Sequence, residues 1–265
     1  MKTHMSCRVK TAARLAVLSL FFSLSARSAD SGGEWEFSLA PLFLWGISID
    51  GDAAIGTATA PLELDFKDDV LENLEAVYTV HFEARKDRLS LIAEYQYVSL
   101  DPTAAAGPVE VDIEFKNTAA ELAVGWEFLR GGQTGWEVLA GLRYLDQDVD
   151  VAGTLSLPEP PLGPGPLPVG ISGGDDWVHP FIGLRTQWQM NSRWSLLTRG
   201  DYGYGGSDDQ AINFSFIFDY RLREWGSAFV GYRYMDFDYD NGSSTARYAY
   251  NAVQQGPLLG FSFHW

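Results

Sequence analysis

Bulky apolar side chains alternate with small or polar ones along most of this chain, and this period of two limits what it can fold into. The clearest run places a bulky residue at every second position from Ile212 to Tyr220, with Asn213, Ser215 and Asp219 between them. Successive side chains of a β-strand point to opposite faces, so the pattern predicts a strand with one apolar and one polar face.

Runs of the same kind recur along the chain, at residues 34–50, 75–86, 89–97, 117–128, 136–144, 178–188, 194–204, 212–220, 230–234 and from 248 onward. They predict an all-β, antiparallel barrel of about ten strands, with about eight or twelve as alternatives. In the first run one face carries Trp35, Phe37, Leu39, Phe43, Trp45, Ile47 and Ile49. Short connections near residues 87, 131, 191 and 223 alternate with longer ones, which predicts tight turns at one end of the barrel.

The apolar face is expected to meet lipid. Mean hydropathy is near zero, as expected when an apolar outer face is averaged with a polar lumen, and residues 29–265 hold no helix-length apolar block. Tryptophans stand beside the tight turns and at both chain ends, which predicts an aromatic girdle of Trp35, Trp126, Trp136, Trp188, Trp194, Trp225 and Trp265. A soluble lipocalin-like barrel is the alternative, but it would fill its interior with apolar residues and would not need this girdle.

Residues 1–28 have the pattern of a secretory signal peptide, with a basic start, the apolar run from Leu15 to Ala26, and a small-residue cleavage site at Ala26-Arg27-Ser28. An uncleaved anchor helix is the alternative. Five of the 19 basic residues and none of the 35 acidic residues lie in this segment. The mature chain, residues 29–265, would then carry 14 basic and 35 acidic residues, a net charge of −21. That charge argues against a nucleic-acid partner. The one cysteine, Cys7, would be removed, which excludes a disulfide scaffold or thiolate enzyme.

Charged residues at the inward positions form the candidate functional set. They are Glu83, Arg85, Glu94, Glu121, Glu127, Arg143, Arg185, Arg199, Asp201, Asp219, Arg221 and Arg233. One interpretation is a structural network of arginine–carboxylate pairs that fills a narrow lumen. The other is a polar path for small solutes, which an acidic rim would make cation-selective. Both readings predict the same pattern in the sequence.

Three further features bear on function. His179, beside Asp175 and Asp176, is the candidate for a catalytic residue at the mouth, although a buried histidine in a polar network is the simpler interpretation. Residues 158–174, rich in proline and glycine, predict a surface loop without strand or helix. Asp69 and Glu72 have capping-box spacing, which predicts a short helix in the first long loop. No cofactor motif or metal site is expected.

The C-terminal stretch 256–265 resembles the sorting signal of bacterial outer-membrane proteins, through Gly260, Phe263 and Trp265. With the signal peptide and the alternating strands, the chain resembles small barrels of the outer-membrane protein A-like superfamily. The resemblance implies export to the outer membrane of a Gram-negative bacterium, contact with lipid and lipopolysaccharide, and recognition of the last strand by the barrel-assembly machinery. Three functions stay open: a structural or narrow porin-like barrel, an outer-membrane protease or lipid A-modifying enzyme, and a surface adhesin.

Overall fold

A computed structural model describes residues 33–101, 103–106, 109–155, 167–242 and 247–265. The predicted signal peptide lies outside the described residues. The compact unit described below is Glu34–Trp265.

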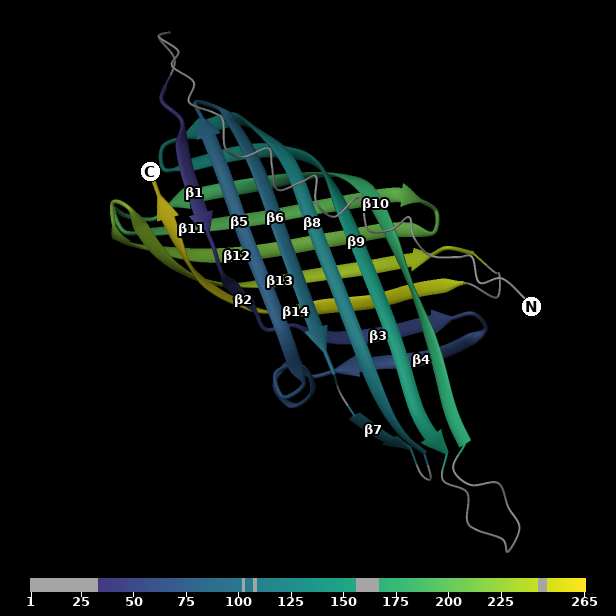
Figure 1. Cartoon of the computed structure of the whole chain (residues 1–265). Helices are drawn as coiled ribbons and strands as arrows, with labels where there is room; N and C mark the ends of the chain where they lie inside the picture. The colour runs from purple at the N-terminus through teal and green to yellow at the C-terminus, as the bar shows by residue number, and fades with distance from the viewer. Residues whose placement is uncertain (1–32, 102, 107–108, 156–166, 243–246) are drawn as a thin grey trace, which may run out of the picture. The chain divides into compact units, whose positions relative to one another are not determined.

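The unit consists almost entirely of β-strands (Figure 1). The elements are β1 (Glu36–Ala40), β2 (Phe43–Trp45), β3 (Ser48–Ile55), β4 (Ala58–Leu64), η1 (Phe66–Val70), β5 (Leu74–Lys86), β6 (Leu89–Leu100), β7 (Thr103–Ala106), β8 (Val109–Gly131), β9 (Thr134–Leu155), β10 (Leu167–Gln189), β11 (Trp194–Gly206), β12 (Asp209–Arg223), β13 (Gly226–Asp240) and β14 (Tyr248–His264). None of the described residues forms a helix long and apolar enough to cross a bilayer.

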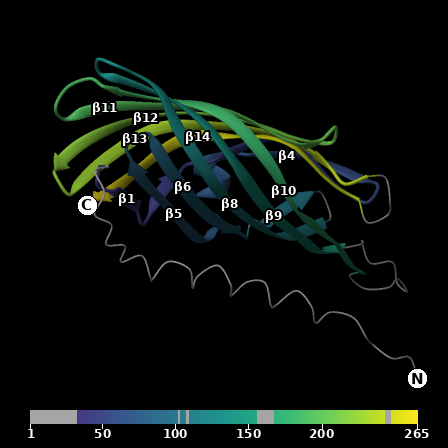
Figure 2. The same ribbon diagram turned by 90° about the horizontal axis from the view of Figure 1, so that it is seen from above.

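The sheet closes on itself because β14 pairs with both β13 and β1. From β5 onward each strand is antiparallel to the next in the order β5-β6-β8-β9-β10-β11-β12-β13-β14, and β1 pairs with β5 to complete the ring. β1, β2 and β3 follow one another along β14 and together count as one barrel strand. The two short strands left over lie in long connections, where β4 pairs with β3 and β7 pairs with β8. The ring therefore has ten strands, which confirms the predicted fold (Figure 2).

The first barrel strand departs from its predicted faces. Between β1 and β2, the five residues from Leu39 to Phe43 stand against the four from Phe263 to Gly260 on β14, which is a β-bulge. The bulge reverses the faces, so Phe43, Ile47 and Ile49 are buried inside the barrel, while Leu42 and Leu44 lie outside. The prediction that Phe43 to Ile49 share a face with Trp35 is therefore wrong.

An apolar belt surrounds the outside. Its exposed side chains include Leu122 and Val124 on β8, Ile182 and Leu184 on β10, and Phe214 on β12. All seven tryptophans of the predicted girdle are exposed, and those of the middle strands stand next to the tight turns. Such a belt with aromatic residues at one level is the surface that a lipid bilayer requires.

Apolar side chains fill the interior at the end away from the tight turns. This apolar plug consists of Ile47, Ile49, Val70, Leu100, Phe115, Leu145, Trp177, Ala211, Met235, Phe237, Tyr248, Tyr250 and Ala252. Along β8 the bulky residues change parity after Phe115, yet the β8–β9 register runs without a shift from Val109 to Glu127, so no bulge causes this change. It marks the level at which the interior changes from polar to apolar, beyond the belt.

Two loop predictions need correction. The predicted loop 158–174 is wrong in its second half, since β10 begins at Leu167 and pairs with the long β9 as far as Leu155; residues 158–166 lie outside the described residues. The first long loop does hold a helix, the five-residue η1, but its N-cap is Asp65. Asp69, the predicted cap, instead accepts a hydrogen bond from the Asp65 amide at 2.8 Å. The Phe66 ring at the start of η1 packs on Gly46, where a Cβ would stand 3.0 Å from it.

Candidate functional site

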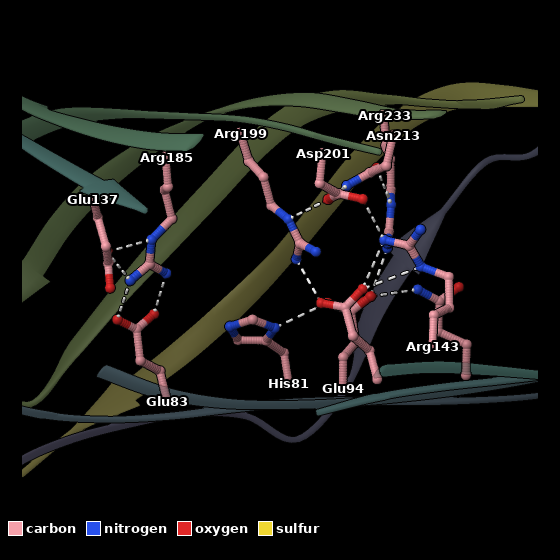
Figure 3. A network of polar contacts seen from close by, with 12 residues as sticks. His81, Glu83, Glu94, Glu137, Arg143, Arg185, Arg199, Asp201, Asn213 and Arg233 are labelled. Carbon is pink, nitrogen blue, oxygen red and sulfur yellow. Dashed lines mark hydrogen bonds and ion pairs between the residues drawn. The ribbon is translucent and has the colours of Figure 1, made fainter. Parts of the chain in front are cut away.

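Among the described residues, the charged interior forms two clusters between the tight turns and the apolar plug, and Figure 3 shows residues of both. In the central cluster, Glu121 accepts from Arg143 Nη2 at 2.9 Å and from Arg199 Nη1 at 2.6 Å. The same two arginines bind Asp201 at 2.8 and 2.7 Å. Arg143 is 2% exposed and Glu121 4%. These paired charges therefore satisfy one another inside the barrel, where a lone charge would be costly.

Arg233 and Glu94 extend this central cluster across the lumen. Arg233 Nη1 donates to Glu94 Oε1 at 2.5 Å, and His81 Nδ1 lies 2.9 Å from Glu94 Oε2. Asn213 connects the two halves, because it donates to Asp201 at 2.6 Å and accepts from Arg233 Nε at 3.2 Å. The central cluster then holds three arginines and three carboxylates, so with a neutral His81 its formal charge is zero.

The second cluster lies towards the tight turns. Arg185 on β10 binds both carboxylate oxygens of Glu83 on β5 at 2.8 Å and Glu137 on β9 at 2.6 Å. Arg85 lies 3.1 Å from Glu83 and 3.6 Å from Glu127, and Arg130 binds Glu127 at 2.5 Å. Here again three arginines face three carboxylates.

Little space remains between these groups. A cavity of about 20 Å³ lies between the central cluster and the apolar plug, beside Trp45, Glu94, Arg143 and Arg233. That volume holds about one water molecule. Trp45 Nε1 and Arg143 Nη1 are buried there with no partner among the described residues, so each is a free donor for such a water. Phe181 fills the space beside them, with the Arg143 and Arg199 guanidinium groups 4.8 and 5.1 Å from its ring centre.

A larger cavity of about 240 Å³ opens at the end with the tight turns. Its walls include Arg85, Arg130, Glu137, Arg185 and Gln187, and it shares no lining residue with the central cavity. The side chains of Arg85, Arg130, Glu137 and Arg185 from the second cluster therefore line a vestibule at this end.

The structure brings ten of the twelve predicted lumen residues into these clusters. The other two lie elsewhere: Arg221 is exposed, and Asp219 accepts from Ser227 at 2.5 Å near the barrel end. The predicted set lacks four members of the clusters: Arg130, which follows β8 into a tight turn, and Glu137, Asn213 and His81, which stand at inward positions of their strands. The alternation alone would have found the last three, had every polar inward residue been counted.

His179 lies apart from the aspartates beside it in the sequence. Its Nδ1 is 3.1 Å from Asp209 Oδ1, its side chain is 0% exposed, and Asp175 instead accepts from Tyr239 at 2.7 Å and Asn241 at 2.6 Å. Near the opposite end, Ser227 Oγ lies between Asp219 and His264 Nε2, 2.9 Å from the latter.

The three residues of the predicted assembly signal lie where the barrel closes. Gly260 stands between Phe43 and Phe229. A Cβ added at Gly260 would lie 2.4 Å from the Phe229 ring and would collide with it. Trp265 and Phe37 exchange backbone hydrogen bonds of 2.8 and 3.1 Å, and their rings stack at 5.7 Å. Phe263 is exposed beside Trp225.

The fold is that of the small β-barrels of bacterial outer membranes. No family model matches the chain, and no curated protein matches it either. Among solved structures, the outer membrane protease OmpT of Escherichia coli matches at a TM-score of 0.55 and 10% identity, over 92% of this chain and 100% of that one. Neisserial surface protein A (0.32; 10%; 88% and 99%) and CarO of Acinetobacter baumannii (0.31; 11%; 88% and 98%) also match. These likenesses concern the fold alone, and the assignment to the outer-membrane protein A-like superfamily stays a prediction.

Proposed function

We propose that the protein is an integral β-barrel of the bacterial outer membrane with a closed interior, which serves as a structural barrel and not as a pore. The apolar belt and its tryptophans support the membrane location, as does the likeness to an outer-membrane fold. Lipid and lipopolysaccharide around the belt, and the assembly machinery at β14, are the partners that this location implies.

The observation that supports a closed interior is the order in which side-chain clusters occupy the lumen. The lumen holds, from the tight turns inward, a vestibule, the cluster around Arg185, the central cluster around Glu121, and the apolar plug. A hydrated ion would have to break buried ion pairs and then cross a plug that offers few polar groups.

The catalytic alternative has less support from the geometry. A histidine at 0% exposure cannot touch a peptide or lipid substrate, and Asp175, its predicted partner, is bound to Tyr239 and Asn241. The contact with Asp209 pairs one ring nitrogen of His179 inside the barrel, while Nε2 is buried with no partner among the described residues.

Single-channel recording tests the proposal. Protein whose folded state is verified by heat-modifiable mobility should give no discrete current steps in planar bilayers, beside a general porin as positive control. Reproducible steps from the folded protein would contradict a closed barrel, and their cation preference would then favour the narrow-pore alternative. That preference would come from rim carboxylates such as Asp148 and Asp236.

A further inference from the structure

β10 leaves half of its length without a neighbour on one side. β9 pairs with it from Leu167 to Trp188 in an unbroken register, but β11 pairs with it only from Phe181 to Gln189. Among the described residues, the edge from Leu167 to Pro180 therefore has no strand partner; in Figure 1 this is the stretch beyond the end of β11. A free strand edge of this length is a template for another strand.

The register shows which amides face that free edge. The Gln189 amide donates towards β9, to Gln133 O at 2.8 Å, and the Met190 amide donates towards β11, to Trp194 O at 3.0 Å. Because neighbouring residues of a strand face opposite sides and the register has no shift, even-numbered residues of β10 face the free edge. These are Gly170, Ser172, Gly174, Asp176 and Val178. The flanking even positions, Pro168 and Pro180, have no amide hydrogen, as is usual for proline at a sheet edge.

Between the two prolines, the charged residues Asp175 and Asp176 are the only usual protection of an edge among the described residues. Residues 169–179 contain no lysine and no bulge. One donor is occupied, because the Asp176 amide binds the Asp175 carboxylate at 3.0 Å. The inward side chains hold the strand in place: Trp177 stacks on Tyr239 at 4.0 Å, and Ile55 packs over Gly173. Among the described residues, the edge therefore presents hydrogen-bonding groups that have no strand partner.

The outer face beside this edge is acidic. Asp176 on β10 and Asp148 and Asp150 on β9 are exposed, and none of the three forms an ion pair among the described residues. Asp148 stands opposite Gly174 and Asp150 opposite Ser172, so only small side chains separate these carboxylates from the edge. Asp148 Oδ1 lies 3.0 Å from the place of a Cβ on Gly174.

We propose that the β10 edge from Gly170 to Asp176 binds an extended basic peptide segment as an additional strand. Its backbone would pair with the even-numbered amides, and lysine or arginine at every second position would cross Gly174 and Ser172 to reach Asp148 and Asp150. Backbone pairing supplies affinity in this mode of recognition, and alternate side chains supply specificity. The proposal goes beyond the closed barrel and does not depend on it, since the edge lies outside the lumen.

Titration of the detergent-solubilised protein with a fluorescent peptide of alternating lysine and valine tests this proposal. Ser172→Pro removes an edge-facing amide and leaves the β9 ladder intact; it should weaken binding by about tenfold. The matched Ser172→Ala should bind like the wild type. Asp148→Asn with Asp150→Asn should weaken binding at low salt and have little effect at high salt. A glutamate–valine peptide should not bind.

Amide hydrogen exchange gives a second test on the unmodified protein. The bound peptide should slow exchange at Ser172 and Gly174 and leave Ile171 unchanged, because the Ile171 amide already faces β9. Two results would overturn the proposal: binding unaffected by Ser172→Pro, or equal binding of an N-methylated lysine–valine peptide, which keeps the charge but cannot form the ladder. Either would mean that the peptide adsorbs by charge alone.

Discussion

Arg185 on β10 donates to both carboxylate oxygens of Glu83 on β5, 102 residues earlier, at 2.8 Å each. The two strands are not neighbours in the sheet, since β6, β8 and β9 separate them on one side. The contact therefore crosses the lumen and joins opposite walls. A bidentate pair also fixes the relative orientation of its partners, so it holds the walls at one distance and one register.

The role of Arg185 can be measured by removing its charge at similar volume. Arg185→Met should cost about 3–5 kcal/mol of unfolding free energy, because Glu83 and Glu137 would stay buried with too little compensation. Urea unfolding in lipid vesicles measures this cost. Arg223→Met, at an exposed arginine, is the control and should change stability by about 0.5 kcal/mol or less. A triple change that also converts Glu83 and Glu137 to glutamine should recover part of the loss.

The two faces of β12 should discriminate between the two signs of charge to different extents. Phe216 lies in the apolar belt, where arginine costs about 2–4 kcal/mol and glutamate less. Ser215 faces inward, and its cross-strand neighbours are Arg199 on β11 and Arg233 on β13. Ser215→Glu should therefore be less destabilising than Ser215→Arg, while Phe216→Glu should be less destabilising than Phe216→Arg by a much smaller margin. If the Ser215→Arg variant unfolds at a higher urea concentration than the Ser215→Glu variant, the arginines of the central cluster do not determine the electrostatic potential at position 215.

The alternation along each strand predicted much of this fold because it is a local property. It identified the strands, the belt and the inward position of residues such as Arg143 and Arg199. It failed at the first strand, where a single bulge between Leu39 and Phe43 exchanged the two faces. The alternation does not mark that bulge, since both parities carry apolar residues there; the local signal is Pro41, because proline within a strand is confined to edges and bulges.

The partners of the inward charges were beyond the sequence for a different reason. Which carboxylate meets Arg185 depends on the stagger of strands around the closed ring, and that stagger is a property of the whole barrel. The same holds for the apolar plug, where Trp177 and Tyr248 meet from distant strands. The free edge of β10 likewise follows from the unequal lengths of β9 and β11, which a periodic pattern does not show.

Asp240 and Arg247 form an ion pair beyond the belt that gives a pH prediction. The hydrogen bond from Arg247 holds the pKa of the Asp240 carboxyl below its usual range, and the Gly242 amide adds to this effect. A depressed folded-state pKa means that the pair contributes stability above the ordinary pKa of aspartate and loses it as pH falls through the lower value. Arg247→Gln should raise the pKa of Asp240, measured by NMR titration of its carboxyl carbon. Arg223→Gln is the charge-matched control and should leave it unchanged, and an equal pKa in all three proteins would rule out the pair.

The backbone bonds between Phe37 and Trp265 predict a defect in assembly. Deleting residues 263–265 removes the pairing of β14 with β1 at Leu39 and Phe37, and with it the closure of the ring at that end. Open barrel edges are not tolerated in lipid, so the truncated chain should fail to reach the heat-modifiable folded form in the outer membrane and should be degraded. Trp35→Ala removes a girdle tryptophan and leaves the seam intact, so it should assemble in normal amounts. Normal amounts of folded, membrane-inserted protein after the deletion would show that neither the seam nor the resemblance to a sorting signal governs assembly.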